Sequence, residues 1–363
     1  MLAVLAAALV SAVELDIHPR ERFEAMFYDH MQKFELKFPN AAEFIKRLSI
    51  FIKNVETIEA HNADKTQTYQ LGPNQFTHMT LEEWRDYLHL GSVRPPVLRR
   101  NPDKVLSAPA DLSTLPASVN WVTAGAVTPV KNQGQCGSCW SFSTTGSLEG
   151  AYFLKNKNLV SFSEQELVSC DTTDKGCNGG WMDDAFTWIK GNGGITTEAQ
   201  YPYTSGTTMQ SGSCSGTGNS VANSAPSGYV DVTPNDVNAL AAAVAITPVS
   251  IAIQANQPAF QSYKSGVLTG KCGQQLDHGV LAVGYGTENG VDYWLIKVRQ
   301  PSPAFFNIFL SFPSLLPSSL TRSHHRMPLP LSLPLSLISS THTELVGHEL
   351  GRQRLHQDRE ELG

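Results

Sequence analysis

The chain has 363 residues, and 41% of them are hydrophobic, so it can bury one large core or two of ordinary size. Its net charge of −6 is mild, and no basic patch indicates binding to nucleic acid or to an anionic membrane surface. All six cysteines lie between residues 136 and 272. This number fits an oxidising compartment if the chain carries an export signal.

The first twelve residues, MLAVLAAALVSA, form a short apolar run that ends in small residues. This pattern predicts a signal peptide over residues 1–12, although the usual positive charge before the apolar run is missing. The run is too short to span a bilayer. A buried N-terminal helix is the alternative interpretation.

Residues from about 20 to 90 predict a helical leader, because they are charged, aromatic and nearly free of glycine. The segment 42–62 has apolar residues at spacings of three and four, which is typical of one face of an amphipathic helix. A second helix is predicted over 80–88, where Thr80 and Glu83 form a capping-box pattern. Residues 91–118 contain five prolines without periodicity and are interpreted as an extended connector.

From about residue 119 the composition shifts to Gly, Ser, Trp and Cys. A helix is predicted to begin near Ser138. The later segments 249–255, 278–286 and 292–297 are apolar and separated by glycine turns, which predicts strands. Helices followed by strands indicate an α+β fold.

The motif Cys136-Gly-Ser-Cys139-Trp140 has four possible meanings. A redox CxxC would need a thioredoxin-like βαβ context, which is absent here, and a zinc site would need a second closely spaced pair. Cys170 and Cys177 are seven residues apart with no His nearby. A structural disulfide and a nucleophile with a disulfide neighbour remain.

The nucleophile interpretation places Cys139 one residue into a helix, where the N-terminal dipole stabilises a thiolate. His278, at the start of a predicted strand and between Asp277 and Gly279, is the candidate base, although a lone His is more often a core residue. Gln133 lies on a Gly-rich loop and could donate to a developing oxyanion together with the backbone N–H of Cys139. Its alternative role is that of a surface loop residue.

Three segments, QGQCGSCWSFS (133–143), GCNGG (176–180) and DHGVLAVGYG (277–286), resemble papain-family cysteine peptidases of the cathepsin L-like branch. The leader also resembles the inhibitory propeptide of that family, whose motif is ExxxRxxxFxxNxxxIxxxN. The matching residues are Glu43, Arg47, Phe51, Asn54, Ile58 and Asn62. The resemblance covers about residues 20–297.

The resemblance implies a papain-like fold of two lobes, with Cys139 as nucleophile, His278 as its ion-pair partner and Gln133 as oxyanion donor. It also implies contacts to the substrate and two disulfides. The substrate contacts would be Gly179 and Gly180 with the peptide backbone, Asp277 beside the catalytic His, and Trp181, Met182 and Leu276 near an apolar S2 pocket. The disulfides would be Cys136–Cys177 and Cys170–Cys214.

The implied organisation is an inhibitory propeptide over 13–110 and a peptidase domain over 111–297. The protein would be a monomeric thiol endopeptidase of the secretory pathway, in a lysosome, a vacuole or the extracellular space. It would act on polypeptides, and its own propeptide would block the cleft. We expect no cofactor and no metal.

One residue of the leader departs from the family pattern. The family has Gly-x-Asn-x-Phe-x-Asp, and Gly72, Asn74 and Phe76 match it, but His78 stands where the pattern expects Asp. We therefore expect the pH control of propeptide release to be altered.

After Lys297 the resemblance stops. The family continues with NSWG..WG..GY, which supplies the Asn that orients the catalytic His, whereas residues 298–343 contain no Gly, Asp or Glu and are dominated by Ser, Pro, Leu and Phe. A disordered low-complexity tail is the ordinary interpretation. The adjacent pair His324-His325 is too weak a pattern to indicate a metal site.

The genetic code favours another interpretation. Every Val codon begins with GT, as an intron does, and Ser, Pro, Leu and Phe can all use pyrimidine-rich codons, as found before a splice acceptor. Residues 344–359, ELVGHELGRQRLHQDR, have a permitted coding that, read one nucleotide later, translates as NSWGTSWGDNGYIKIA. We interpret residues 298–363 as a retained intron followed by an exon read out of frame.

This interpretation predicts an impaired product. The orienting Asn is missing, the strand 292–297 would expose a sheet edge, and Cys272 would lack its partner. A non-catalytic inhibitor or decoy of sister peptidases is therefore the alternative function, and a thioredoxin-like redox protein is a distant third.

Overall fold

The computed structural model describes residues 19–88, 105–215, 219–269, 273–298, 307–311 and 339–341. The predicted signal peptide, part of the connector, Cys272 and most of the tail lie outside these residues. The helices are α1 (Pro19–Lys33), α2 (Ala41–Ala63), α3 (Leu81–Tyr87), α4 (Cys139–Asn156), α5 (Glu164–Cys170), α6 (Met182–Gly191), α7 (Ser205–Thr208), α8 (Val237–Ile246), α9 (Pro258–Ser262) and the 3-10 turn η1 (Leu112–Thr114). The strands are β1 (Tyr69–Leu71), β2 (Val105–Leu106), β3 (Val119–Asn120), β4 (Val230–Val232), β5 (Val249–Ile253), β6 (Tyr263–Leu268), β7 (His278–Glu288), β8 (Val291–Lys297), β9 (Asn307–Ser311) and β10 (Ser339–Thr341).

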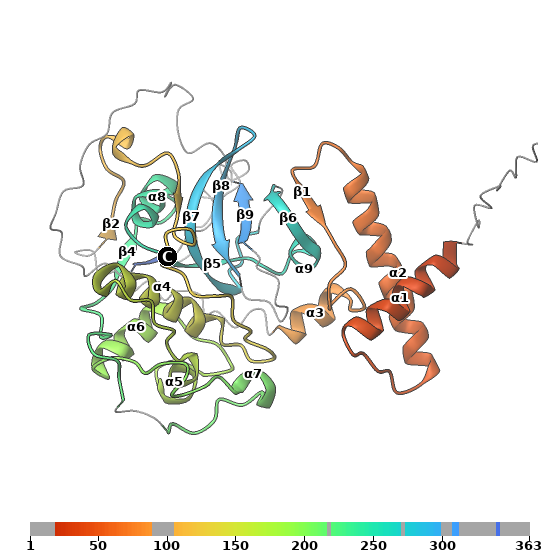
Figure 1. The fold of residues 1–363 in the computed structure, drawn as a ribbon, viewed down its shortest axis with the longest axis horizontal. Coiled ribbons are helices and arrows are strands. Elements are labelled where there is room, and N and C mark those ends of the chain that lie inside the picture. Colours follow the sequence, from red (N-terminus) through yellow and green to blue (C-terminus); the bar gives the residue numbers. More distant parts are fainter. Residues whose placement is uncertain are drawn as a thin grey trace, which may run out of the picture.

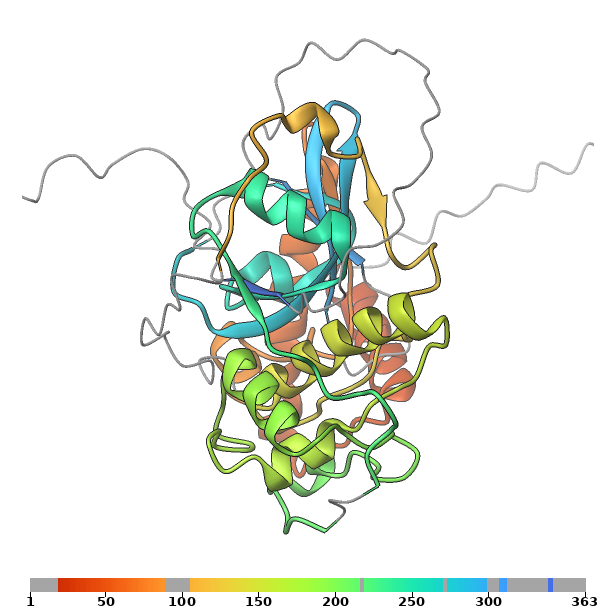
Figure 2. The same ribbon diagram turned by 90° about the vertical axis from the view of Figure 1, so that its left-hand side faces the viewer.

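The part of the molecule that follows the leader has two lobes, as the resemblance implies. In Figure 1 the helices α4 to α7 gather below the strands β5, β7 and β8, and α8 lies beside these strands. Figure 2 shows the same division from the side, with the strands above and the helices below. The predicted order of helices first and strands later is confirmed, and the fold is α+β.

The strands form one mixed sheet in the order β1-β6-β9-β8-β7-β5-β10-β4-β2, and β3 pairs with β7. Strands β5 and β7 pair antiparallel, with Val249 opposite Ala282 and Ile253 opposite His278. Strand β7 in turn pairs antiparallel with β8. This pairing places His278 at the end of the sheet where β5 stops.

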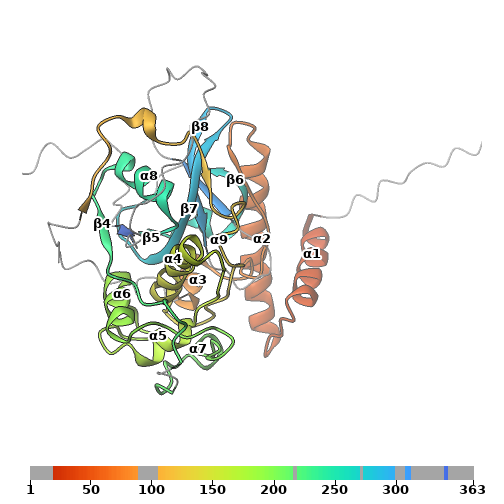
Figure 3. The same ribbon diagram turned by 60° about the vertical axis from the view of Figure 1, so that its left-hand side comes forward.

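The leader forms a helical unit at one end of the molecule, where α2 lies next to the sheet and α1 lies outside it (Figure 3). The predicted helix over 42–62 is confirmed as α2, and its apolar face, which includes Leu48 and Phe51, packs with Phe23 and Phe27 of α1. The predicted capping box is also confirmed at the start of α3. The leader thus has a core of its own.

The leader also joins the sheet. Strand β1 pairs antiparallel with β6, with Tyr69 opposite Gly266. The side chains of Phe76 and Trp84 enter the core of the strand lobe, beside Phe260 and Tyr263. The leader and the sheet lobe therefore share both a β-pairing and a hydrophobic core.

One structural expectation is wrong. The strand 292–297 was expected to lie at an exposed sheet edge, but β9 pairs antiparallel with β8, with Lys297 opposite Asn307 and Tyr293 opposite Ser311. Strand β9 also pairs in parallel with β6. Its residues lie within the segment 298–343, whose backbone can complete the ladder because strand pairing uses main-chain groups that every residue except Pro supplies.

Candidate active site

Cys139 is the first residue of α4, as the sequence predicts. Its side chain is 2% exposed and takes no part in either disulfide of the described chain. The next residue, Trp140, is completely buried, and its indole N–H donates to the carbonyl of Gly176 at 3.1 Å. The thiol is therefore fixed at the positive end of an 18-residue helix, an environment that favours a thiolate.

The helix α4 packs along β7, the strand that begins at His278. The hydroxyl of Ser143 donates to the carbonyl of Val280 at 2.7 Å. One turn earlier, a side chain at Gly279 would lie 3.2 Å from the carbonyl oxygen of Cys139. The backbone of Gly279 thus touches that of Cys139, so the preceding residue, His278, lies at the N-terminus of α4.

Gln133 is buried, with 4% exposure, so the interpretation as a surface loop residue is wrong. Its side-chain amide donates to the carbonyl of Cys136 at 3.0 Å, and its own carbonyl accepts from the hydroxyl of Tyr203 at 2.8 Å. These bonds hold an amide group on the loop that leads into Cys139. Such a group can serve an oxyanion.

The structure contains the two disulfides that the resemblance implies, Cys136–Cys177 and Cys170–Cys214. The first joins the loop before Cys139 to the GCNGG segment, and Gly137 pairs with Asn178 in an isolated bridge. This link holds Gly179 and Gly180 close to the start of α4.

Trp181, Met182 and Leu276 belong to one hydrophobic cluster, together with Cys139 and Trp140. Met182 is completely buried and Trp181 is 6% exposed, whereas Leu276 is only partly buried. The three residues of the expected S2 region therefore belong to the same apolar core as Cys139.

Asp277 supports a loop of the chain. Its two carboxylate oxygens accept from the backbone N–H groups of Ala255 at 2.6 Å and Asn256 at 3.2 Å. Burial raises the pKa of Asp277 to about 6, and these two N–H groups and the nearby charge of Arg85 oppose the rise. This capping role was not visible in the sequence, because the loop and Asp277 are 21 residues apart.

The propeptide motif forms a network of contacts. Arg47 donates to Glu43 and to Glu83 at 2.6 Å each, and it also donates to the carbonyl of His78 at 3.3 Å. Glu83 is also the capping-box residue of α3, so the network ties the capped end of α3 to α2. These ion pairs lower the pKa of Glu83 to about 2, against the opposing effect of burial.

The other motif residues hold the segment after α2. Asn54 donates to the carbonyls of Thr77 and Met79 at 2.8 and 2.9 Å, and Asn62 exchanges two hydrogen bonds of 2.9 Å with the backbone of Leu71. Phe51 and Ile58 are buried. The spacing of the motif therefore serves the packing of β1 and the 72–80 segment on α2.

The same segment contacts the catalytic domain through polar groups. Asn74 donates to the carbonyl of Gln261 at 2.6 Å, and Gln261 donates back to the carbonyl of Met79 at 3.1 Å. Arg85 donates twice to the carbonyl of Asn256, at 3.0 and 2.6 Å. Arg85 thereby reaches the loop that Asp277 caps.

His78 is 6% exposed and has a partner that the sequence did not reveal. Its Nδ1 lies 3.2 Å from Nε2 of His30 in α1, which is 5% exposed. The rings of Phe34, Phe38 and Phe51 pack around the pair. The partner was missed because the two histidines are 48 residues apart.

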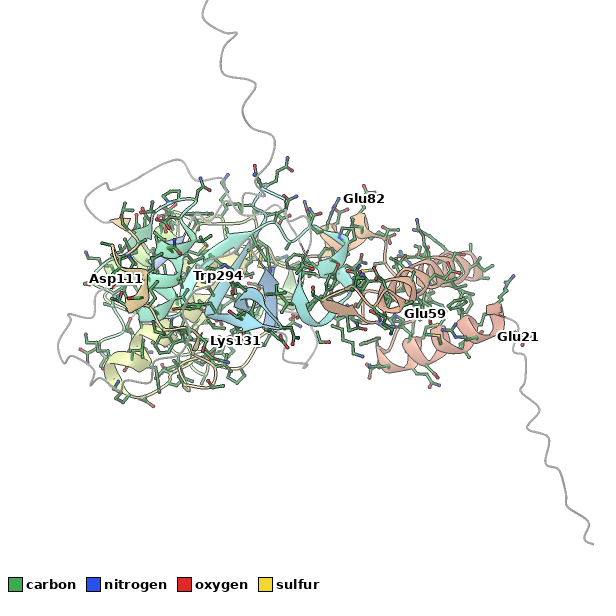
Figure 4. The ribbon with its side chains drawn as sticks, turned by 90° about the horizontal axis from the view of Figure 1, so that it is seen from above. Glu21, Glu59, Glu82, Asp111, Lys131 and Trp294 are labelled. Carbon is green, nitrogen blue, oxygen red and sulfur yellow. A yellow bond between two sulfur atoms is a disulfide. The ribbon has the colours of Figure 1, made fainter. Side chains whose placement is uncertain are left out.

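A largely buried ion cluster is centred on Lys131. Lys131 donates to Glu149 at 3.1 Å and Glu164 at 2.7 Å, and Thr128 links Glu149 to the side chain of Lys297. These carboxylates raise the pKa of Lys131 despite its burial. In Figure 4, Lys131 and Trp294 lie in the body of the molecule, far from Glu21 and Glu59 of the propeptide helices.

Among the residues that the structure describes, no group of three or more His, Cys, Asp or Glu side chains could hold a metal ion. Within the same part of the chain, no helix is both long and apolar enough to cross a membrane.

Comparisons with known proteins agree with the geometry. Residues 115–299 match the model of the papain family cysteine proteases, and residues 27–84 match that of the cathepsin propeptide inhibitor domain. Germination-specific cysteine protease 1 of Arabidopsis thaliana is 45% identical over 258 residues, covering 69% of this chain and 67% of that protein. Cysteine proteinase EP-B 1 of Hordeum vulgare is 42% identical over 315 residues, covering 82% and 81%.

Solved structures show the same likeness. A recombinant stem bromelain precursor has a TM-score of 0.69 at 34% identity, and digestive procathepsin L 3 of Tenebrio molitor has 0.68 at 37% identity. Each alignment covers 80% of this chain and 92% of the other.

Proposed function

The chain belongs to the papain family of cysteine proteases and is the zymogen form with its inhibitor domain, and we propose that Cys139, His278 and Gln133 form its catalytic centre. The observation that carries this proposal is the contact between the backbones of Gly279 and Cys139, which puts His278 at the helix terminus that holds the thiol. Burial of the loop with Gln133 beside the same terminus supports the third assignment.

The reaction follows from these positions. The thiolate of Cys139 attacks the carbonyl carbon of the peptide bond, and the N–H groups of Gln133 and of the Cys139 backbone stabilise the oxyanion. His278 gives its proton to the leaving amine as the C–N bond breaks, which leaves an acyl-enzyme. Water then attacks the thioester, His278 takes up its proton, and the carboxylic acid product leaves as the thiolate is restored.

The substrate would bind as an extended chain. Gly179 and Gly180 would pair with its backbone, and Trp181, Met182 and Leu276 would favour an apolar side chain at P2. Because Met182 is completely buried, it would shape this pocket from beneath, while the partly buried Leu276 would contact the substrate itself.

The zymogen would be organised as a signal peptide over 1–12, a propeptide over 13–110 and a catalytic domain from 111. Two disulfides in one lobe support maturation in an oxidising compartment. The protein would enter the secretory pathway and act as a monomer in a vacuole, a lysosome or the extracellular space.

Titration of the active-site thiol tests the proposal. The full chain is treated with iodoacetamide before and after acid removal of the propeptide, and the labelled residue is identified by mass spectrometry. We expect rapid labelling of Cys139 only after removal, and none in the matched Cys139→Ser variant. An unreactive Cys139 in the folded, processed protein would contradict the assignment and favour the non-catalytic inhibitor.

A further inference from the structure

Two buried carboxyl groups precede the segment that contains Gly179 and Gly180, and one of them, Asp174, contacts it. Asp171 and Asp174 are 5% and 7% exposed. Oδ1 of Asp174 accepts from the backbone N–H of Trp181 at 2.7 Å, and Oδ1 of Asp171 accepts from the N–H of Thr173 at 2.8 Å. Asp174 is therefore attached to the far end of the segment.

Gly180 is held between Asp174 and Trp140. A Cβ atom at Gly180 would lie 2.6 Å from Oδ1 of Asp174 and 2.6 Å from the indole ring of Trp140. Such distances leave no room for a side chain. Trp140 directly follows Cys139, so its ring limits how closely Gly180 can approach the thiol. Asp174, on the opposite side of Gly180, limits how far Gly180 can move away.

The turn beneath the segment is closed by main-chain bonds. The N–H of Lys175 donates to the carbonyl of Gly179 at 2.9 Å, and the N–H of Asn178 donates to the carbonyl of Lys175 at 3.0 Å. Gly179 has φ of 97°, which an L side chain rarely adopts. The backbone of the segment therefore has one defined conformation, and Asp174 determines its position relative to α4.

The two residues are in contact, because the backbone N–H of Asp174 donates to Oδ1 of Asp171 at 3.4 Å. Oδ2 of each is buried and accepts no hydrogen bond from a described residue, so a proton held between the two carboxyls would satisfy both atoms. Burial raises the pKa of both groups, and the charge of Asp171 adds to the rise for Asp174, whose pKa reaches about 9 although the N–H of Trp181 opposes it. Asp174 therefore keeps its proton at neutral pH.

We propose that Asp174, hydrogen bonded to Asp171, is a positioning residue that sets the height of the Gly179–Gly180 segment above Cys139, so that this segment can pair with the backbone of a peptide substrate. The inference rests on the proposed function, since it assigns a peptide to this segment. It does not concern the reactivity of the thiol, which depends on α4 and His278.

Two reagents that alkylate Cys139 distinguish the position of the Gly179–Gly180 segment from the reactivity of the thiol. Iodoacetamide has no peptide backbone and reports the thiol alone. A dipeptidyl chloromethyl ketone with Phe at P2 must also pair with Gly179 and Gly180. Both second-order labelling rates are measured on the acid-processed full chain and on the variants Asp174→Ala, Asp174→Asn and Asp184→Asn.

We expect Asp174→Ala to slow the peptidyl probe by about tenfold, the equivalent of one lost backbone hydrogen bond, and to leave the iodoacetamide rate unchanged. Asp174→Asn should keep the wild-type ratio of the two rates, because an amide can accept from Trp181 and donate to Asp171. The matched control Asp184→Asn should also keep it, since within the described residues no hydrogen bond joins the Asp184 side chain to Gly179 or Gly180.

An Asp174→Ala variant with the wild-type ratio, or one in which both rates fall together, would overturn the inference. A wild-type thiol that does not react with iodoacetamide at all would overturn the proposed function, and the inference with it.

Discussion

The histidines at positions 30 and 78 determine how the propeptide responds to acid. Burial lowers the pKa of each from 6.5 to about 4, and the charges of His78 and Lys33 add to this for His30, as that of Arg47 does for His78. Glu83 and a hydrogen bond with the backbone of Gln75 oppose the shift of His78. The pKa of each histidine is lower in the folded state than in the unfolded state, so folding is favoured while both histidines are neutral. The stability that the two neutral histidines contribute is complete above pH 6.5 and is lost as the pH falls towards 4.

Replacing His78 with Asp should therefore change the pH at which the propeptide opens. A carboxylate beside Arg47 stays charged until lower pH, so we expect unfolding of the propeptide to begin at lower pH in His78→Asp than in the parent. Unfolding is followed by circular dichroism between pH 7 and 3, in a Cys139→Ser background that prevents self-cleavage. His78→Asn serves as a variant that cannot titrate at this position. An identical pH profile for His78→Asp and the parent would refute the expectation.

At the scale of secondary-structure elements, the packing of α4 against the strand lobe depends on small residues. A Cβ atom at Gly150 would lie 2.5 Å from the ring of Pro248, just before β5, and the neighbouring Ser147 donates to the carbonyl of Pro248 at 3.0 Å. The ring of Pro248 cannot rotate away. Helix α4 must therefore approach β5 through a glycine.

We accordingly expect Gly150→Ala to lower the free energy of unfolding by about 1–3 kcal/mol, although alanine is the better helix former. Gly191→Ala, at the end of α6, is the matched control, because nothing lies within 4 Å of a Cβ atom at that position. Urea unfolding of both variants measures the difference. Equal stability of Gly150→Ala and the parent would show that α4 can shift without cost.

The elements that could be predicted from the sequence are those with a local cause. Helix α2 has an apolar repeat along its length, and α3 has both partners of its capping box within four residues. The pairing of β1 with β6 joins residues almost 200 positions apart, and β1 has only 3 residues, so no local pattern indicated it.

The candidate site divides in the same way. Cys139, His278 and Gln133 lie in recognisable motifs, whereas Asp174 and His30 act through residues that only the fold brings near them. A buried carboxyl in a polar loop such as DTTDKG has the same sequence appearance as an exposed one. Burial, which gives Asp174 its proposed role, is a property of the packed molecule.

At the scale of the whole molecule, β8 is the last strand of the recognisable catalytic domain, and it contacts both lobes. Lys297 closes β8, and its ammonium group donates to Thr128 at 3.0 Å within the buried ion cluster. Its position is thus fixed from both lobes. A family-type Asn in the next position would be held at the end of the same strand.

The interpretation of residues 298–363 as a retained intron and a shifted exon can be tested on this basis. We expect sequencing of transcripts across the codon of Lys297 to find a dominant message that continues with Asn-Ser-Trp-Gly.

The corresponding chain should exceed the 363-residue chain in turnover of a peptide substrate by at least about tenfold, because an orienting partner fixes the tautomer and ring angle of His278. Equal turnover of the two chains would mean that β9 and the present tail support catalysis without that Asn. A message that keeps the insert in polysomes would instead show that this chain is made as it stands, and the inhibitor or decoy function would then be the one to measure.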